Sequence, residues 1–94
     1  MNDSLALRHF PAGHVLFAEG DPADAAYIVE AGWVEIFVRR EDGEQRLSLL
    51  GPGEIFGEMA LVDDAPRSAG ARVLEDVVCV LVERAQILRE IDRA

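Results

Sequence analysis

Residues 56–69 read FGEMALVDDAPRSA, and this stretch is more informative than any other part of the chain. A short helical turn that opens at Gly57 would point unpaired backbone N–H groups at an anion. Arg67 adds a planar, permanently charged guanidinium that suits the same anion. Glu58 only accepts hydrogen bonds when ionised, so it suits a sugar hydroxyl and repels a phosphate. The stretch, called the cassette below, therefore predicts a site for one small phosphate together with its sugar.

Short apolar stretches separated by Gly and Pro lie on both sides of the cassette. We expect strands over residues 14–18, 26–30, 33–40, 45–50, 55–56, 68–74 and 77–82. Turns are expected at residues 31–32, at Asp42-Gly43, which is a strong hairpin signal, and at residues 75–76. Many short strands at this spacing predict a mainly β domain, namely an antiparallel double-sheet β-roll of the jelly-roll type. Short helices are expected at the termini and in the cassette.

The alternation of side chains assigns the two faces of the predicted sheet. The inward side chains are expected to be Val34, Ile36, Val38, Leu47 and Leu49. Trp33 and Phe37 fall on the opposite face, where we expect them to pack under terminal helical segments; an exposed patch for a partner is the alternative. From Glu83 the apolar residues recur at helical spacing, which predicts an amphipathic helix with an apolar face of Ile87, Leu88 and Ile91.

Composition limits the class of protein. With 94 residues, the chain is expected to form one domain over residues 1–94. The net charge of −9 opposes binding to nucleic acid, because a phosphate backbone needs a basic face. No apolar run is long enough to span a membrane, and the first residues lack a signal-peptide pattern. Cys79 lies in an apolar stretch and is expected to be a buried hydrophobic residue. We expect a cytoplasmic protein.

Catalytic and metal sites are not expected from the sequence. His9 and His14 are the only two histidines, and they form no His-x-His pair, which argues against a cupin-type metal site. Asp63 and Asp64 precede Pro66 in a polar loop, so we interpret them as solvated charges. No nucleophile and base stand out as a pair, and we therefore expect no enzyme, no metal and no cofactor.

Taken whole, the sequence resembles the cyclic-nucleotide-binding domain shared by catabolite-activator-type bacterial regulators, kinase regulatory subunits and nucleotide-gated channels. The resemblance rests on the cassette and on Phe10-Pro11-Ala12-Gly13, Glu19-Gly20-Asp21, Tyr27-Ile28-Val29, Gly32, Gly51-Pro52-Gly53-Glu54 and Leu74-Glu75-Asp76. It extends over residues 10–92. The family fold is an eight-stranded β-roll that holds cAMP or cGMP, and the ligand switches an attached effector domain.

The resemblance implies roles for individual residues. Arg67 would pair with the cyclic phosphate, and Glu58 would accept a hydrogen bond from the ribose 2′-hydroxyl. The residues expected to contact the ligand are Gly57, Glu58, Met59, Ala60, Arg67, Ser68, Ile36 and Leu47. A surface ion pair between Arg67 and Glu58 is the alternative, which the cassette context disfavours. Because Arg67 is expected to serve the ligand, its removal is expected to leave the fold intact.

The expected function is that of a non-catalytic sensor module. It would bind a cyclic purine mononucleotide, cAMP or cGMP, and relay occupancy to a partner or effector domain. The alternative is an interaction domain that keeps the fold and binds no nucleotide. Family members usually end in a longer helix that closes over the base, and this chain is expected to stop before that lid helix. Its C-terminal helix is then available to a homodimer or a partner protein, and neither nucleic acid nor a membrane is expected to bind.

Overall fold

The computed structural model describes residues 6–93, and it describes the side chains of residues 7–87 and 89. The described elements are β1 (Ala6–Phe10), β2 (Val15–Phe17), β3 (Ala25–Arg40), β4 (Gly43–Leu50), β5 (Ile55–Phe56), α1 (Glu58–Asp63), β6 (Gly70–Glu83) and α2 (Arg84–Arg93). All strand pairs are antiparallel, so the mainly β class is confirmed. Within residues 6–93, no helix is both long and apolar enough to cross a membrane.

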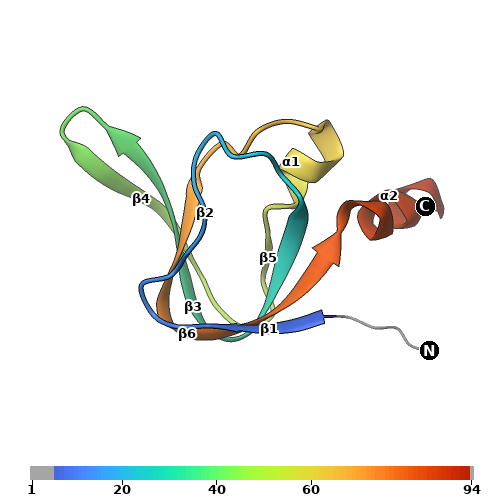
Figure 1. The fold of residues 1–94 in the computed structure, drawn as a ribbon, viewed down its shortest axis with the longest axis horizontal. Coiled ribbons are helices and arrows are strands. Elements are labelled where there is room, and N and C mark those ends of the chain that lie inside the picture. The colour runs from blue at the N-terminus through green and yellow to red at the C-terminus, as the bar shows by residue number, and fades with distance from the viewer. Residues whose placement is uncertain (1–5, 94) are drawn as a thin grey trace.

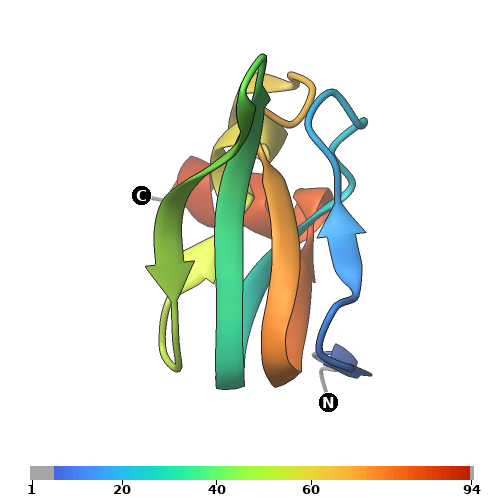
Figure 2. The same cartoon turned by 90° about the vertical axis from the view of Figure 1, so that its left-hand side faces the viewer.

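Two long strands, β3 and β6, form the centre of the roll and contribute to both of its layers. They pair from Ala25 opposite Glu83 to Phe37 opposite Gly70. One layer consists of residues 33–40 of β3 and 70–75 of β6, together with β4 and β2. The other consists of residues 25–29 of β3 and 77–83 of β6, together with β5 and β1. Figure 1 shows the two layers as the arms of a U, and Figure 2 shows the first layer face-on. The expected double-sheet roll is confirmed, and one continuous sheet supplies both layers.

The two turns expected within these strands are wrong. Residues 31–32 and 75–76 lie inside continuous strands, where the ladder between β3 and β6 shifts register. Gly32 has a φ of +89°, which lets β3 bend without breaking its pairing. Strand β1 was not expected from the sequence, because its five residues carry little alternation of their own. It forms by pairing with residues 77–81 of β6.

The core lies between the two layers. Its buried members are Tyr27, Val29, Val34, Phe56, Ala71, Val73, Val77 and Cys79. Full burial of one such apolar side chain contributes about 1.5–3 kcal/mol. Cys79 is fully buried as expected, and this burial raises the pKa of its thiol to about 11. The thiol is therefore protonated at neutral pH and acts as a packing group.

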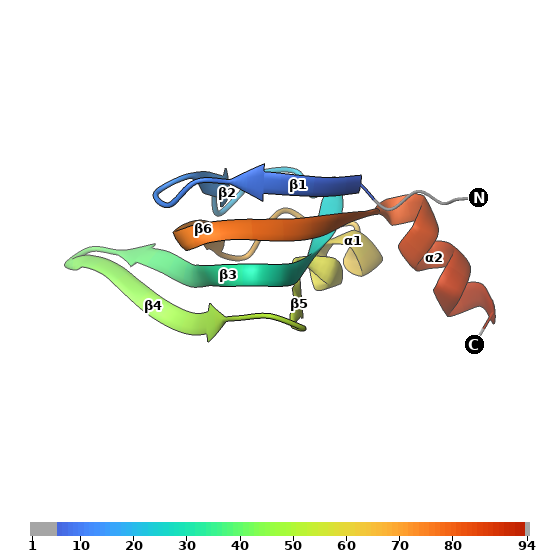
Figure 3. The ribbon, with the colours of Figure 1, turned by 90° about the horizontal axis from the view of Figure 1, so that it is seen from below.

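The outer face of the β3–β4–β6 layer differs from expectation. Leu49 pairs opposite Glu35 in the ladder, so it lies on the outer face and not inward. Trp33 is 42% exposed, and its ring covers Gly51 beside Leu49 and Leu74. Phe37 packs against Gly70 on the same face. Neither aromatic ring lies under a terminal helix, because α2 extends beyond the end of β6 and contacts α1 instead (Figure 3).

Gly32 offers a direct test of the bend. A Cβ at this position would collide with the carbonyl oxygen of Asp76 and lie 2.8 Å from the Cα of Val77. Gly53 has nearly the same φ, +90°, and a Cβ there meets no atom within 4 Å. We therefore expect Gly53→Ala to cost about 1–2 kcal/mol from the left-handed backbone alone. Gly32→Ala should cost a further ~1–3 kcal/mol from overpacking.

Urea unfolding of both variants measures this difference. Equal free energies of unfolding for Gly32→Ala and Gly53→Ala would contradict the close approach of β3 and β6 at this point.

Candidate anion-binding site

The first turn of α1 begins at Gly57. Gly57 has a φ of +83° and is the N-cap of α1, and no side chain caps the helix there. A left-handed backbone conformation causes no strain in glycine, whereas it would strain any other residue. The helix ends at Asp64, another left-handed residue, whose N–H caps carbonyl groups of the last turn. The expected short helical turn in the cassette is confirmed.

Arg67 is buried in the middle of the cassette, with only 3% of its surface exposed. Its Nη1 donates to the carbonyl oxygen of Gly57 at 2.7 Å, and its Nη2 donates to that of Ala25 at 2.6 Å. The guanidinium carbon lies 4.0 Å from the centre of the Phe17 ring. We call these three contacts, from β2, β3 and the cassette, the arginine cage. A Cβ on Gly57 would lie 2.8 Å from Nη1, so glycine is needed here for space as well as for conformation.

The backbone of Arg67 is held as firmly as its side chain. Its N–H donates to the carbonyl oxygen of Asp21, and its carbonyl oxygen accepts from the N–H of Gly20, both at 2.8 Å. The carboxylate of Asp21 also accepts from the N–H of Ala18 at 2.9 Å. The loop between β2 and β3 therefore fixes the position from which the guanidinium enters the cage.

The charge of Arg67 is only weakly compensated within the described residues. Its ion-pair contact is Asp24, at 3.6 Å from Nη2, and the side chain of Asp24 is 87% exposed. The Nε of Arg67 is buried and has no hydrogen-bond partner among these residues. A buried cation is costly unless it is paired, so this arrangement favours the arrival of an anion.

The structure brings some of the expected site residues together. A hydrogen bond joins Arg67 to Gly57, and Glu58 and Ala60 lie half-buried at the start of α1. Met59 and Ser68 have exposed side chains. The alternative of a surface ion pair between Arg67 and Glu58 is wrong, because Arg67 is buried and its acceptors are the two carbonyl groups.

Ile36 and Leu47 lie at an irregularity of the β3–β4 ladder. Ile36 pairs with Ser48, whereas the next residue of β3, Phe37, pairs with Arg46, so Leu47 has no partner in the ladder. Ile36 is half-buried against the core, and Leu47 is 51% exposed. Their contact with a ligand stays a prediction.

Two contacts of the cage were not expected from the sequence. Phe17 was assigned only to a strand, and Ala25 lay just before one. The carbonyl of Ala25 carries no sequence signal, because every residue has a carbonyl group. Phe17 carries a weak signal, since it precedes the Glu19-Gly20-Asp21 turn that binds the backbone of Arg67.

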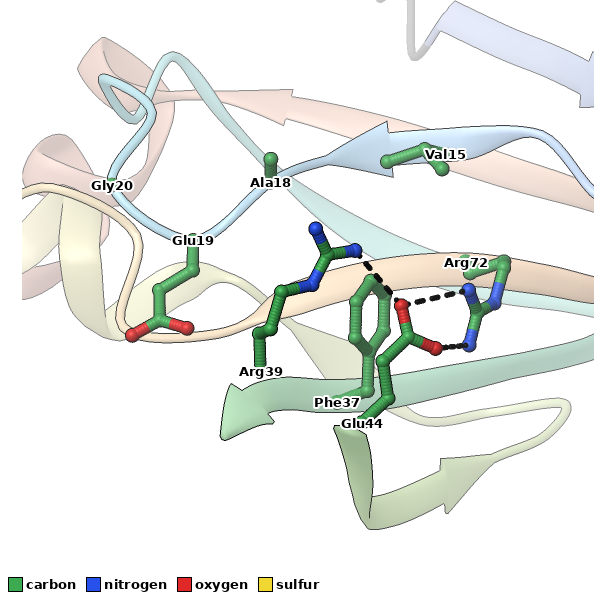
Figure 4. Close-up of a pocket in the computed structure, with 8 residues that line it drawn as sticks. All are labelled: Val15, Ala18, Glu19, Gly20, Phe37, Arg39, Glu44 and Arg72. Atoms are coloured by element: carbon green, nitrogen blue, oxygen red, sulfur yellow. Dashed lines mark hydrogen bonds and ion pairs between the residues drawn. The ribbon is translucent and has the colours of Figure 1, made fainter. Parts of the chain in front are cut away.

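A cavity of about 590 Å³ lies away from the cassette, on the outer face. It is lined by Val15, Ala18, Glu19, Gly20, Phe37, Arg39, Glu44 and Arg72. In Figure 4 the carboxylate of Glu44 lies between the guanidinium groups of Arg39 and Arg72. It accepts from them at 3.0 and 2.8 Å, respectively. These two cations are already paired with a carboxylate, whereas Arg67 is not closely paired.

Glu35 belongs to the same network of ion pairs, because Arg72 donates to both Glu44 and Glu35. Glu35 is 7% exposed and accepts from Arg46 and from Arg72, each at 2.7 Å. The guanidinium of Arg72 also lies 4.3 Å from the centre of the Phe37 ring. Hydrogen bonds from Arg72 and Arg46 hold the pKa of Glu35 below its ordinary value.

Metal ligation has no support among the side chains that the structure describes, where no group of three or more His, Cys, Asp or Glu is placed to hold an ion. His14 stacks on Phe10, with the ring centres 5.1 Å apart.

Comparison with known proteins identifies relatives over nearly the whole chain. The family model described as the cyclic nucleotide-binding domain matches residues 7–94. A CRP-like cAMP-activated global transcriptional regulator of Mycobacterium tuberculosis is 42% identical over 76 residues, which cover 80% of this chain and 34% of that protein. A cAMP-dependent protein kinase regulatory subunit of Emericella nidulans is 43% identical over 75 residues, which cover 80% of this chain and 18% of that protein. This chain thus spans about a third or less of these two relatives.

Solved structures match the fold equally well. The cAMP-bound form of the EAL enzyme Bd1971 aligns with a TM-score of 0.91 and 43% identity, covering 95% of this chain and 24% of that one. The cGMP-bound form of Bd1971 aligns with a TM-score of 0.92, also at 43% identity, with the same 95% and 24% coverage. The roll described above is therefore the fold of a protein that has been solved with either nucleotide.

The arginine cage adds a loss of stability to the expectation that removal of Arg67 leaves the fold intact. In Arg67→Ala, the carbonyl groups of buried Ala25 and half-buried Gly57 lose their donor, at about 1–3 kcal/mol for a buried group and less for an exposed one. Relief from burying a weakly paired charge offsets part of this, so we expect a net loss of about 1–3 kcal/mol. Arg39→Ala is the matched control, because that side chain is 76% exposed, and it should cost less than about 1 kcal/mol. Equal free energies of unfolding for Arg67→Ala and the parent, measured in urea without ligand, would contradict the cage.

The lowered pKa of Glu35 predicts that the protein loses stability in acid. Because folding lowers the pKa of Glu35, this residue contributes to the free energy of unfolding above pH 4.5, the ordinary pKa of the group. The contribution is lost as the pH falls below that value. We expect the free energy of unfolding of the parent to fall more steeply below pH 4.5 than that of Glu35→Gln. At neutral pH the variant should be less stable by about 1.5–3 kcal/mol, the usual range for hydrogen bonds to a charged group. Urea titrations across this pH range make the comparison, and parallel curves for the two proteins would refute the assignment.

Proposed function

The chain belongs to the cyclic nucleotide-binding domain family, and on this basis we propose that it is a non-catalytic sensor module that binds a cyclic purine mononucleotide, cAMP or cGMP. The observation that carries the proposal is the buried, weakly compensated charge of Arg67. Its Nε lacks a partner among the described residues, and a cyclic phosphate supplies the missing acceptor and the missing negative charge.

The start of α1 supports binding of the ribose and the phosphate. Gly57 provides no side-chain cap, so the N–H groups of Glu58, Met59 and Ala60 are free to donate to the ligand. Glu58 is half-buried in this first turn and accepts from the ribose 2′-hydroxyl.

The purine requires an apolar surface, for which we propose Ile36 and Leu47. The irregularity in the β3–β4 ladder leaves the apolar side chain of Leu47 half-exposed beside β3, where it is available to a ligand. Ser68 follows Arg67 directly and exposes its hydroxyl, which would serve the phosphate or the base.

Relay of occupancy is proposed to pass through α2. This helix contacts α1, and Arg84 at its start pairs with Asp64 at the end of α1 at 3.3 Å. We propose that α2 also provides the contact to a homodimer or a partner protein. Ile87 of its expected apolar face is half-buried, and the side chains of Leu88 and Ile91 lie outside the described residues.

The alternative of an interaction domain without a nucleotide is not favoured. The relatives include a cAMP-activated regulator, and Bd1971 has been solved with cAMP and with cGMP. A regulatory role agrees with the names of two relatives, a transcriptional regulator and a kinase regulatory subunit. Absence of turnover and a cytoplasmic location form part of the proposal.

Titration calorimetry with cAMP, cGMP and 2′-deoxy-cAMP tests the proposed function. We expect the ribonucleotides to bind and 2′-deoxy-cAMP to bind about 5- to 150-fold more weakly, because Glu58 loses its donor at a cost of about 1–3 kcal/mol. In Glu58→Gln this discrimination should shrink. Asp63→Asn, at the exposed far end of α1, should retain it. Absence of binding by cAMP and by cGMP would refute the proposed function, and equal affinity for the deoxy ligand would refute the role of Glu58.

A further inference from the structure

The contacts of the arginine cage are all positioned by one group of aromatic side chains. Phe17, Tyr27 and Phe56, called the aromatic cluster below, lie with ring centres 5.1–6.1 Å apart. Tyr27 stacks on Phe56 at an interplanar angle of 9°, and the two residues pair across β3 and β5. The cluster therefore ties β2, β3 and β5 together directly beneath Arg67.

Each ring of the cluster lies close in sequence to a contact of the cage. Phe56 directly precedes Gly57, and Tyr27 follows Ala25 by two residues, so both rings belong to the segments whose carbonyl groups accept from Arg67. Phe17 acts without an intermediary, since its own ring faces the guanidinium at 4.0 Å. Phe17 is only half-buried, whereas the other two rings are buried.

The ring of Phe17 contacts the Arg67 guanidinium in addition to the two carbonyl groups, which carry no full negative charge. Nη1 and Nη2 of Arg67 are used by carbonyl oxygens, and the guanidinium carbon lies over the ring. A ring face attracts a cation and, being flat, keeps the guanidinium parallel to itself. The unpartnered Nε is thereby held in a fixed direction.

We propose that Phe17 is a positioning residue for ligand binding, whose ring fixes the plane of Arg67 so that Nε donates to the cyclic phosphate. The inference rests on the proposed function and goes further, because it assigns part of the phosphate affinity to an aromatic ring in β2. An aliphatic residue of similar hydrophobicity fills the same space but cannot hold the guanidinium plane.

Affinity for cAMP in a set of matched variants tests this role. Phe17→Leu should weaken binding about fivefold, the size of one partly exposed cation–π contact. Phe17→Tyr keeps a ring and should stay within about twofold of the parent. Phe10→Leu makes the same change elsewhere at the edge of the core and should also stay within about twofold. Weakening by Phe10→Leu as large as that by Phe17→Leu, or no weakening by Phe17→Leu, would overturn the proposal.

A double-mutant cycle separates positioning from packing. Arg67→Lys keeps the cation but lacks the planar group that stacks on a ring, so in this background Phe17→Leu should change the affinity by less than about twofold. An effect of about fivefold that persists in the Arg67→Lys background would show that Phe17 acts without the guanidinium.

A measurement on the parent protein tests the proposal even if a variant fails to fold. Nuclear magnetic resonance should show the Nε–H of Arg67 shifted upfield by the ring current of Phe17 and protected from exchange by burial. Saturating cAMP should move this signal, and an Nε–H signal unchanged by bound cAMP would overturn the proposal. Failure of the parent to bind either nucleotide would instead count against the proposed function, while the upfield shift in the ligand-free protein still reports the ring contact.

Discussion

The burial of the Arg67 guanidinium is the interaction on which the site and much of the roll depend. A guanidinium needs acceptors for its donors wherever water is excluded, and here the carbonyl groups of Gly57 and Ala25 provide them. These carbonyl groups belong to the cassette and to the start of β3, so a single side chain joins the turn at Gly57 to the sheet. Because neither carbonyl carries a full charge, the cation remains weakly neutralised and ready for an anion.

The shape of the roll follows from the two long strands. Strands β3 and β6 could not each serve both layers without bending, and the register shifts near Gly32 allow the bend while the ladder continues. The bend brings β2, β3 and β5 close enough for the aromatic cluster to form. The cage above that cluster is therefore a consequence of the curvature of the sheet.

The charged groups of the outer face and the charge of Arg67 are compensated differently. On the outer face, Glu35 and Glu44 pair with arginines of neighbouring strands, so these charges neutralise one another within the protein. In the cassette, Arg67 has carbonyl groups and an exposed, more distant Asp24. This difference favours Arg67 as the proposed anion site over the cavity on the outer face, although two arginines line that cavity. The charge that matters for a ligand is the one that the protein leaves incompletely paired.

The sequence alone determined the β class, most strands and the short helix after Gly57, and it pointed to Arg67 and Glu58 as candidate site residues, whose contact with a ligand stays a prediction. These depend on local signals, namely alternation, turn residues and the spacing within the cassette. Only the tertiary structure decided that residues 31–32 and 75–76 are bends and not turns, that β1 joins the sheet, and that Leu49 lies on the outer face. It alone decided that Arg67 is also a structural residue, held by Phe17 and Ala25. The reason is physical, because these outcomes depend on which backbone groups and rings meet across the sheet, and a carbonyl group gives the same sequence signal at every position.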